Sequence, residues 1–313
     1  MLAARSFKLA VLCAALLSVN ARSLQQAEAP APGGALSPVD IANFALQLEY
    51  LEAQFYSCAA TGQPLPSSLL GNGAPAVTGC QKANLTTVGQ QLASELMHNE
   101  MNHVEVLRAA LGSAAVSAPL INIGSSFSEI LNAALGNPAS PAYSPYDNDI
   151  FFLLGAFMFE DVGVTAYEGA IQALANSPYL QTAARIAAVE AYQAGIVRSF
   201  LFQANEGKNP NWPYQPTIST VVGDIAKLRA GASNSADDVG ILNGTTATLV
   251  PVDNQSLVFL RDPTQVLDIV TLGKGATGGG FFPNGLNGGL TSTSLSGVGG
   301  SISSGTAPQP TAG

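Results

Sequence analysis

The 313-residue chain is poor in charged residues, and in basic residues above all, which limits the classes of partner that it can bind. Charged residues make up 11% of the sequence, with 12 Lys and Arg against 21 Asp and Glu, and the basic residues do not cluster. The formal net charge is −9. Nucleic acids and anionic membranes attract proteins through basic patches, so we expect neither of them as a partner.

Long hydrophobic runs are also scarce, and the clearest one is a short run at the N-terminus. A basic start with Arg5 and Lys8 precedes an apolar core, Leu9 to Val19, that is too short to span a bilayer. The Val-Asn-Ala sequence that follows offers a small-residue cleavage site. Residues 1–21 are therefore predicted to be a signal peptide of a secreted protein, extracellular or in the cell wall, with a buried helix as the alternative. We expect no further membrane helix.

Cysteine is limited to three residues, and Cys13 would leave with the signal peptide. Cys58 and Cys80 remain as an even pair in an oxidising compartment and are predicted to form a disulfide. No free Cys/His pair and no Ser/His/Asp arrangement is then visible, so the sequence does not support nucleophilic catalysis. Sequons for N-glycosylation, in agreement with secretion, begin at Asn84, Asn243 and Asn254.

What the sequence does contain is long helical periodicity between residues 37 and 207. Helices are expected at 38–60, 85–111, 146–175 and 178–206, and Ser37 and Pro38 suit the N-cap and first position of the first helix. The second and third helices are joined by a long connection with room for a short helix in "FSEILNAAL", and the other links are expected to be short. This pattern predicts an all-α fold, the ferritin-like four-helix bundle with one long crossover.

The two histidines both follow a glutamate by three residues, and helical phase separates the two pairs. On a helical wheel the apolar residues of the second helix lie within roughly 60° of Glu100, and His103 falls in the same sector. Glu95 and His98 lie on the opposite face, which is expected to be solvated. Glu and His at this spacing point to one spot and suit iron, manganese or zinc.

Each of the other long helices also carries a glutamate within its apolar stripe. These residues are Glu49, with Glu52 at the edge of the stripe, Glu160, and Glu190 with Gln193 beside it. Buried carboxylates are costly unless they are paired or bind a metal. His103 supplies at most one positive charge, and Arg198 is expected towards the edge of its helix. Two divalent cations would neutralise the four carboxylates; the alternative is edge glutamates that are protonated or paired with arginine.

These residues resemble those of the ferritin-like di-metal carboxylate proteins, in which two helices give Glu and two give Glu-x-x-His. "LEYLEAQFY", "NEMNH", "FMFEDVGVTAYEGAI" and "VEAYQ" are similar to the four helices in turn. The resemblance implies a di-metal centre of iron or manganese, with zinc as a further option. The implied ligands are Glu49, Glu100, His103, Glu160, Glu190 and Gln193, with Glu52, Tyr56 and Tyr167 around them. Because Gln193 stands where His is often found, the second metal position is expected to be weaker.

A narrower resemblance covers residues 37–290 and is to the desiccation-related, ferritin-like proteins of plants and algae. Besides the bundle motifs, it is carried by "NQSLVFLRDPTQVLDIVTLG" and "GGGFFPNGLNGG". That family is secreted and associated with water-stress tolerance. The resemblance implies protection against desiccation or oxidative stress through metal binding or redox chemistry. A non-enzymatic extracellular stress protein, with the bundle as scaffold and a vestigial metal site, remains the alternative.

Residues 208–290 are predicted to form an extension that packs on the bundle rather than a separate domain. A helix is expected from about Thr217 to Arg229, and a second one begins after Asp262 as N-cap and ends at Gly273. Trp212 is expected to serve packing. Residues 291–313 are rich in Gly and Ser and are predicted to be disordered.

Overall fold

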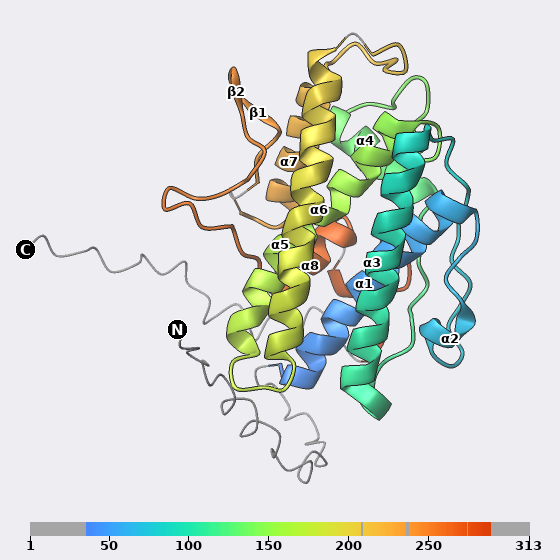
Figure 1. The fold of residues 1–313 in the computed structure, drawn as a ribbon, viewed down its shortest axis with the longest axis vertical. Coiled ribbons are helices and arrows are strands. Elements are labelled where there is room, and N and C mark those ends of the chain that lie inside the picture. Colours follow the sequence, from blue (N-terminus) through green and yellow to red (C-terminus); the bar gives the residue numbers. More distant parts are fainter. Residues whose placement is uncertain (1–35, 208, 236–237, 274, 289–313) are drawn as a thin grey trace, which may run out of the picture. The chain divides into compact units, whose positions relative to one another are not determined.

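The computed structural model describes residues 36–207, 209–235, 238–273 and 275–288 of the chain, and these are mostly helical (Figure 1). The four long helices are Pro38–Thr61 (α1), Thr87–Leu111 (α3), Asp149–Ala173 (α5) and Leu180–Glu206 (α6). The prediction of an all-α fold built on a four-helix bundle is confirmed. The predicted signal peptide (1–21) and the Gly/Ser-rich tail (291–313) lie outside the described residues.

Capping side chains determine where three of the long helices begin. Ser37 accepts a hydrogen bond from the backbone N–H of Asp40, whose side chain in turn accepts from Ser37, as the sequence predicted. Thr86 caps α3 and Asn148 caps α5, so these helices begin at 87 and 149 rather than at 85 and 146. A capping oxygen satisfies a backbone N–H of the first turn and so fixes the start of the helix. The remaining ends of the four helices lie within two residues of the predicted ones.

The long helices form two hairpins, because α1 packs along α3 and α5 packs along α6 (Figure 1). The connection 112–148 is the predicted crossover and holds a 3-10 turn, Gly112–Ala114 (η1), and the short helix Ser125–Leu135 (α4). The link between α5 and α6 is short, as predicted. The α1–α3 connection is not the short link that was expected, since it covers 62–86 and includes helix α2, Ser67–Leu70.

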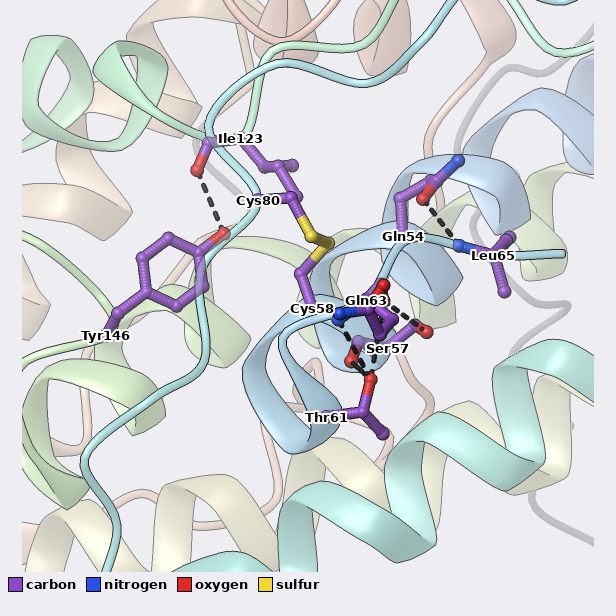
Figure 2. The surroundings of a disulfide bond; sticks show 9 residues. All are labelled: Gln54, Ser57, Cys58, Thr61, Gln63, Leu65, Cys80, Ile123 and Tyr146. Carbon is purple, nitrogen blue, oxygen red and sulfur yellow. Dashed lines mark hydrogen bonds between the residues drawn. A yellow bond between two sulfur atoms is a disulfide. The ribbon is translucent and has the colours of Figure 1, made fainter.

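The Cys58–Cys80 disulfide is present and fastens this longer connection to the end of α1 (Figure 2). The two Cα atoms lie 5.1 Å apart across 22 positions of sequence. Neighbouring side chains hold the same turn, because Ser57 Oγ donates to the carbonyl of Gln63 and Gln54 Oε1 accepts from the N–H of Leu65. The disulfide and these hydrogen bonds together hold the start of the connection against the end of α1.

Beyond the bundle, the described chain adds helices α7 (Ile218–Ala232) and α8 (Pro263–Val270), a 3-10 turn, η2 (Gly275–Thr277), and a small hairpin of β1 (Leu242–Asn243) and β2 (Thr246–Ala247). Asp262 caps α8, as the sequence predicted. Thr217 caps α7, which ends at Ala232 rather than at the predicted Arg229. Helix α8 ends at Val270, earlier than the predicted stop at Gly273. The hairpin was not predicted; its two-residue turn places Gly244 at a left-handed φ of 61°.

A buried cluster of ion pairs joins these later residues to α5 and α6. Asp161 on α5 accepts from Arg198 at 2.7 Å and from Arg229 at 2.9 Å, and Asp238 accepts from Arg229 and Arg261 at 2.8 Å each. The side chain of Arg198, which was expected towards the edge of its helix, is fully buried and pairs with Asp161 rather than with a stripe glutamate. Its guanidinium donates to the carbonyls of residues 239, 240 and 248, which cover that face of α6.

The core also settles two expectations about apolar residues. Helix α5 is long and apolar enough to cross a membrane, judged by length and composition alone, although no such helix was expected from the sequence. However, 94% of its most apolar 18-residue stretch is buried inside the protein. Trp212 packs edge-on against the rings of Phe151 and Tyr214, and its Nε1 donates to the carbonyl of Pro216. The packing role predicted for Trp212 is therefore confirmed.

Candidate metal centre

The four stripe glutamates all point into the bundle interior. Glu49 on α1, Glu100 on α3, Glu160 on α5 and Glu190 on α6 are each at most 1% exposed. His103, one turn after Glu100, is 8% exposed. The helical phase of these residues thus gave their burial correctly.

The other Glu-His pair of α3 behaves as the sequence analysis expected. Glu95 and His98 are both exposed. His98 Nδ1 lies 2.6 Å from the carbonyl oxygen of Ser94 in the preceding turn and not near a carboxylate of the interior. This pair is part of the solvated face of α3.

Glu49, Glu100, His103 and Glu190 bring ligand atoms within 4.8 Å of one another. His103 Nδ1 lies 2.8 Å from Glu100 Oε2, 3.2 Å from Glu49 Oε2 and 3.7 Å from Glu190 Oε1. Side chains from three different long helices therefore converge on one point. Three carboxylates and one imidazole at this spacing form a group that could hold a metal ion.

Two tyrosines cross-connect α1 and α5 beside this group. The Tyr56 hydroxyl on α1 donates to Glu160 Oε1 on α5, and the Tyr167 hydroxyl on α5 donates to Glu49 Oε1 on α1. Glu160 is outside the group of four, but its charge adds to burial and to the charges of Glu52, Glu100 and Glu49 in raising the pKa of Glu190. Both tyrosines, predicted to surround the metals, thus contact carboxylates of the predicted ligand set.

Gln193 on α6 also reaches this interior. Its Nε2 donates to Glu100 Oε1 at 2.6 Å, and its Oε1 is buried without a hydrogen-bond partner among the described residues. An amide oxygen is a weaker ligand than an imidazole nitrogen for iron, manganese or zinc. Gln193 was expected beside Glu190, and the structure adds its contact with Glu100.

Glu52 is a fifth carboxyl of this interior. The sequence placed it at the edge of the apolar stripe of α1, but it is 6% exposed. Burial, followed by the charges of Glu100 and Glu49, raises its pKa well above the usual value for glutamate. The signal that could have shown its burial is that α1 has no charged residue besides Asp40, Glu49 and Glu52, and so has no charged face for solvent.

Burial and repulsion between neighbouring carboxylates shift the pKa values of the residues in this group. Burial, and then Glu49, raises the pKa of Glu100 to about 7, and burial also raises the pKa values of Glu160 and Glu190 well above the usual range. Burial alone would lower the pKa of His103, but Glu49 and Glu100 outweigh it and raise that pKa to about 11. Burial would raise the pKa of Glu49, but His103 outweighs it and lowers that pKa.

Two features of these side chains suit a metal cation: an excess of carboxylates over basic groups, and buried acceptor atoms without a hydrogen-bond partner. Glu160 Oε2, both carboxylate oxygens of Glu190 and Gln193 Oε1 are buried with no hydrogen-bond partner in the described part of the chain. Among the described residues, His103 is the one basic side chain in an ion pair with these glutamates. Buried acceptors without donors are costly, whereas metal cations need such atoms. An oxygen-rich set with one nitrogen suits iron, manganese or zinc.

Comparisons with known proteins agree with the helical fold. The family model described as a ferritin-like domain matches residues 37–203. The chain is 28% identical over 263 residues to "Ferritin-like catalase Nec2" of Nesocodon mauritianus, covering 80% of this chain and 83% of that protein. It is 29% identical over 247 residues to "Desiccation-related protein PCC13-62" of Craterostigma plantagineum, covering 75% and 78% respectively. No solved structure matches the chain.

Proposed function

Because the chain belongs to the ferritin-like family, we propose that it is a secreted protein whose bundle holds a di-metal carboxylate centre that removes hydrogen peroxide. The observation that carries the proposal is the convergence of Glu49, Glu100, His103 and Glu190 within 4.8 Å in a buried interior. The catalase and desiccation-related names of the two relatives support a function in oxidative protection during water stress.

The proposal places two metal positions among these side chains. Glu49, Glu100 and His103 would hold the first ion, and Glu160 and Glu190, with Gln193 beside them, would hold the second. Iron and manganese suit these ligands and supply the exchange of electrons with peroxide when they are bound. Glu100 accepts a hydrogen bond from Gln193, so the residues proposed for the two ions are in direct contact.

The residues around the centre select for small reactants and hold protons. All four stripe glutamates are buried, so a reactant of about the size of water suits the site better than a larger organic substrate. Tyr56 and Tyr167 each hold a hydroxyl proton against a carboxylate. In the proposed reaction two molecules of hydrogen peroxide give two of water and one of dioxygen. One peroxide is reduced and the other is oxidised, so no further reductant is needed.

Secretion is part of the proposal and rests on the chain itself. The signal-peptide pattern of residues 1–21 and the Cys58–Cys80 disulfide both support an oxidising compartment. Asn84, Asn243 and Asn254 are exposed, as glycosylation would require. Mass spectrometry of protein from its native source should find a mature N-terminus near Arg22 and glycans on these asparagines.

Peroxide removal is tested by oxygen evolution from protein loaded with Mn(II) or Fe(II). Glu100→Ala removes a central carboxylate and should abolish the activity together with metal retention. Glu95→Ala is the matched control, because Glu95 lies on the exposed face of the same helix and should leave both unchanged. Equal oxygen evolution from the Glu100→Ala protein and the wild type would refute the proposed centre.

The scaffold alternative is favoured by one observation, the presence of Gln193 where a nitrogen ligand would strengthen the second position. In that case the bundle would serve as a stable extracellular stress protein without turnover. Metal analysis of protein purified from its native secretory route separates the two functions. Stoichiometric metal supports the centre, and protein without metal supports the scaffold.

A further inference from the structure

Gly163 occupies a special place beside the proposed centre. It lies on α5, one turn after Glu160, and faces Glu190 on α6. A Cβ atom built on Gly163 would stand 3.0 Å from the carboxyl carbon of Glu190 and still closer to its Oε2. The carboxylate of Glu190 thus fills the volume that any other side chain at position 163 would need.

The other helical glycines of the described chain meet different neighbours. A Cβ on Gly155 would meet the rings of Phe55 and Phe127, and one on Gly169 would meet the backbone of Arg261, so these two glycines serve packing. A Cβ on Gly195 of α6 would meet nothing within 4 Å. Among the described helical glycines, Gly163 is the one that faces a carboxylate of the centre.

A glycine at position 163, inside helix α5, lowers the stability of the helix, which indicates that a neighbouring group requires glycine there. Glycine in a helix interior lowers helix stability relative to alanine because the unfolded chain loses more conformational freedom. On α1 the residue one turn after Glu49 is Glu52, which is buried beside the same group of carboxyls. The α1 position is therefore filled by a carboxyl, while the α5 position is left open for a carboxylate that comes from α6.

We infer that Gly163 is a positioning residue for the second metal position, because it lets the Glu190 carboxylate turn inward against the α5 backbone. The inference rests on the proposed metal centre. Both oxygens of Glu190 are buried without a hydrogen-bond partner in the described residues, so they are available to a cation where they stand. A methyl group at position 163 would displace this carboxylate without removing any ligand.

The test compares Gly163→Ala with Gly195→Ala in metal-free protein titrated with Mn(II). Gly163→Ala should weaken the weaker of the two binding events by roughly tenfold or more, as changes around metal ligands typically do. Its metal-free melting temperature should equal or exceed that of the wild type, because alanine favours the helix. Gly195→Ala should raise helix stability in the same way and leave both Mn(II) binding events unchanged.

A rescue variant separates positioning from general packing. Glu190→Asp shortens the carboxylate side chain by one methylene, so the double variant Gly163→Ala/Glu190→Asp should bind Mn(II) at the second position more tightly than Gly163→Ala alone. If Gly163→Ala does not fold but the double variant does, the clash with Glu190 is still demonstrated. If Gly163→Ala binds both ions like the wild type, or if the double variant restores neither folding nor binding, the inference is wrong. Absence of Mn(II) binding to the wild type would instead refute the proposed function.

Discussion

The α1–α3 hairpin and the α5–α6 hairpin build the centre from the same spacing. Helix α1 places Glu49 seven residues before Tyr56, and α5 places Glu160 seven residues before Tyr167. Each tyrosine donates to the glutamate of the other helix. The second helix of each hairpin then adds one more buried glutamate, Glu100 or Glu190. The two halves are therefore related by an approximate twofold repeat around the carboxylates.

The halves differ at two positions of this repeat. His103 on α3 corresponds to Gln193 on α6, and Glu52 on α1 corresponds to Gly163 on α5. The α1–α3 half thus holds the imidazole and the fifth carboxyl, and the α5–α6 half holds an amide and an open volume. Under the proposed function, the α1–α3 half therefore binds a cation more strongly, and binding in the α5–α6 half depends on how Glu190 is placed.

The halves are also fastened to the rest of the chain by different means. The Cys58–Cys80 disulfide anchors the α1–α3 half, and the ion pairs of Asp161 with Arg198 and Arg229 anchor the α5–α6 half. A covalent link is insensitive to pH and salt, whereas buried ion pairs depend on every partner being present. Breaking each anchor in turn measures how much each half depends on it.

Removal of Asp161 should have the largest effect on stability. Asp161→Ala leaves Arg198 and Arg229 buried with fewer partners and should lower the free energy of unfolding by about 3–5 kcal/mol. Urea unfolding followed by circular dichroism measures the change. Asp224→Ala is the matched control, because its ion pair with Lys227 lies at the surface and should cost less than about 1 kcal/mol. Equal effects of the two substitutions would show that the buried cluster is not an anchor.

Loss of the disulfide should have the next largest effect. Replacement of Cys58 and Cys80 together by Ala releases a loop of 22 positions, which chain entropy values at about 3 kcal/mol of unfolding free energy. The measurement is again urea unfolding, with the wild type under reducing conditions as a second arm. An unchanged unfolding midpoint in both arms would contradict the anchoring role.

The metal-free protein should become less stable as the pH rises. The pKa of Glu100 is raised to about 7 and that of His103 to about 11, so both groups bind protons more tightly when folded. A group whose pKa is raised on folding stabilises the protein fully at pH values below its pKa in the unfolded chain. This stabilisation is lost as the pH rises through its pKa in the folded protein. The pKa of Glu49 is lowered, so this group changes the stability only at pH values below the usual pKa of glutamate.

Between pH 5.5 and 8.5 the melting temperature of metal-free protein should therefore fall, and the fall should be smaller with Mn(II) bound. Differential scanning calorimetry at both pH values, with and without Mn(II), checks this. The Glu95→Ala protein should behave like the wild type, because that carboxyl is exposed. A melting temperature that rises over this range in metal-free protein would contradict the charge assignment.

The smallest of these effects is expected from replacing Gln193 by His, which would match His103 of the other half. Gln193→His gives the α5–α6 half the nitrogen ligand that α3 has and should tighten the weaker Mn(II) binding event by roughly tenfold. The tighter event should not change, because its imidazole is His103. Isothermal titration calorimetry distinguishes the two events. A change confined to the tighter event would mean that the positions are assigned to the wrong halves.

The sequence predicted the four glutamates and His103 because helical phase alone decides which residues face a bundle interior. It placed Glu52 and Arg198 at helix edges because a wheel assumes that the outer face of a helix meets water. In the structure, the carbonyl of residue 248 contacts Arg198 and covers that face of α6, whereas Glu52 turns towards the interior beside Glu100 and Glu49. No periodicity within a helix shows where such a covering segment lies.

The hydrogen bonds between the halves were beyond the sequence for a similar reason. The Tyr56–Glu160 and Tyr167–Glu49 contacts depend on how α1 and α5 align, and the volume above Gly163 depends on α6. These relations are set by packing between helices that are distant in sequence. The residue types could be recognised as ligands and neighbours, but their pairing depends on how the helices pack.

The most direct test of the account is a titration of metal-free wild-type protein with Mn(II), followed by calorimetry and by melting temperature. The account predicts two ions per chain, one bound tightly and one more weakly, with the melting temperature rising mainly on the first because metal binds the folded state. The double variant Glu100→Ala/His103→Ala should show neither event. An unchanged melting temperature and no heat of binding in the wild type would contradict the central claim that these buried carboxylates form a metal centre.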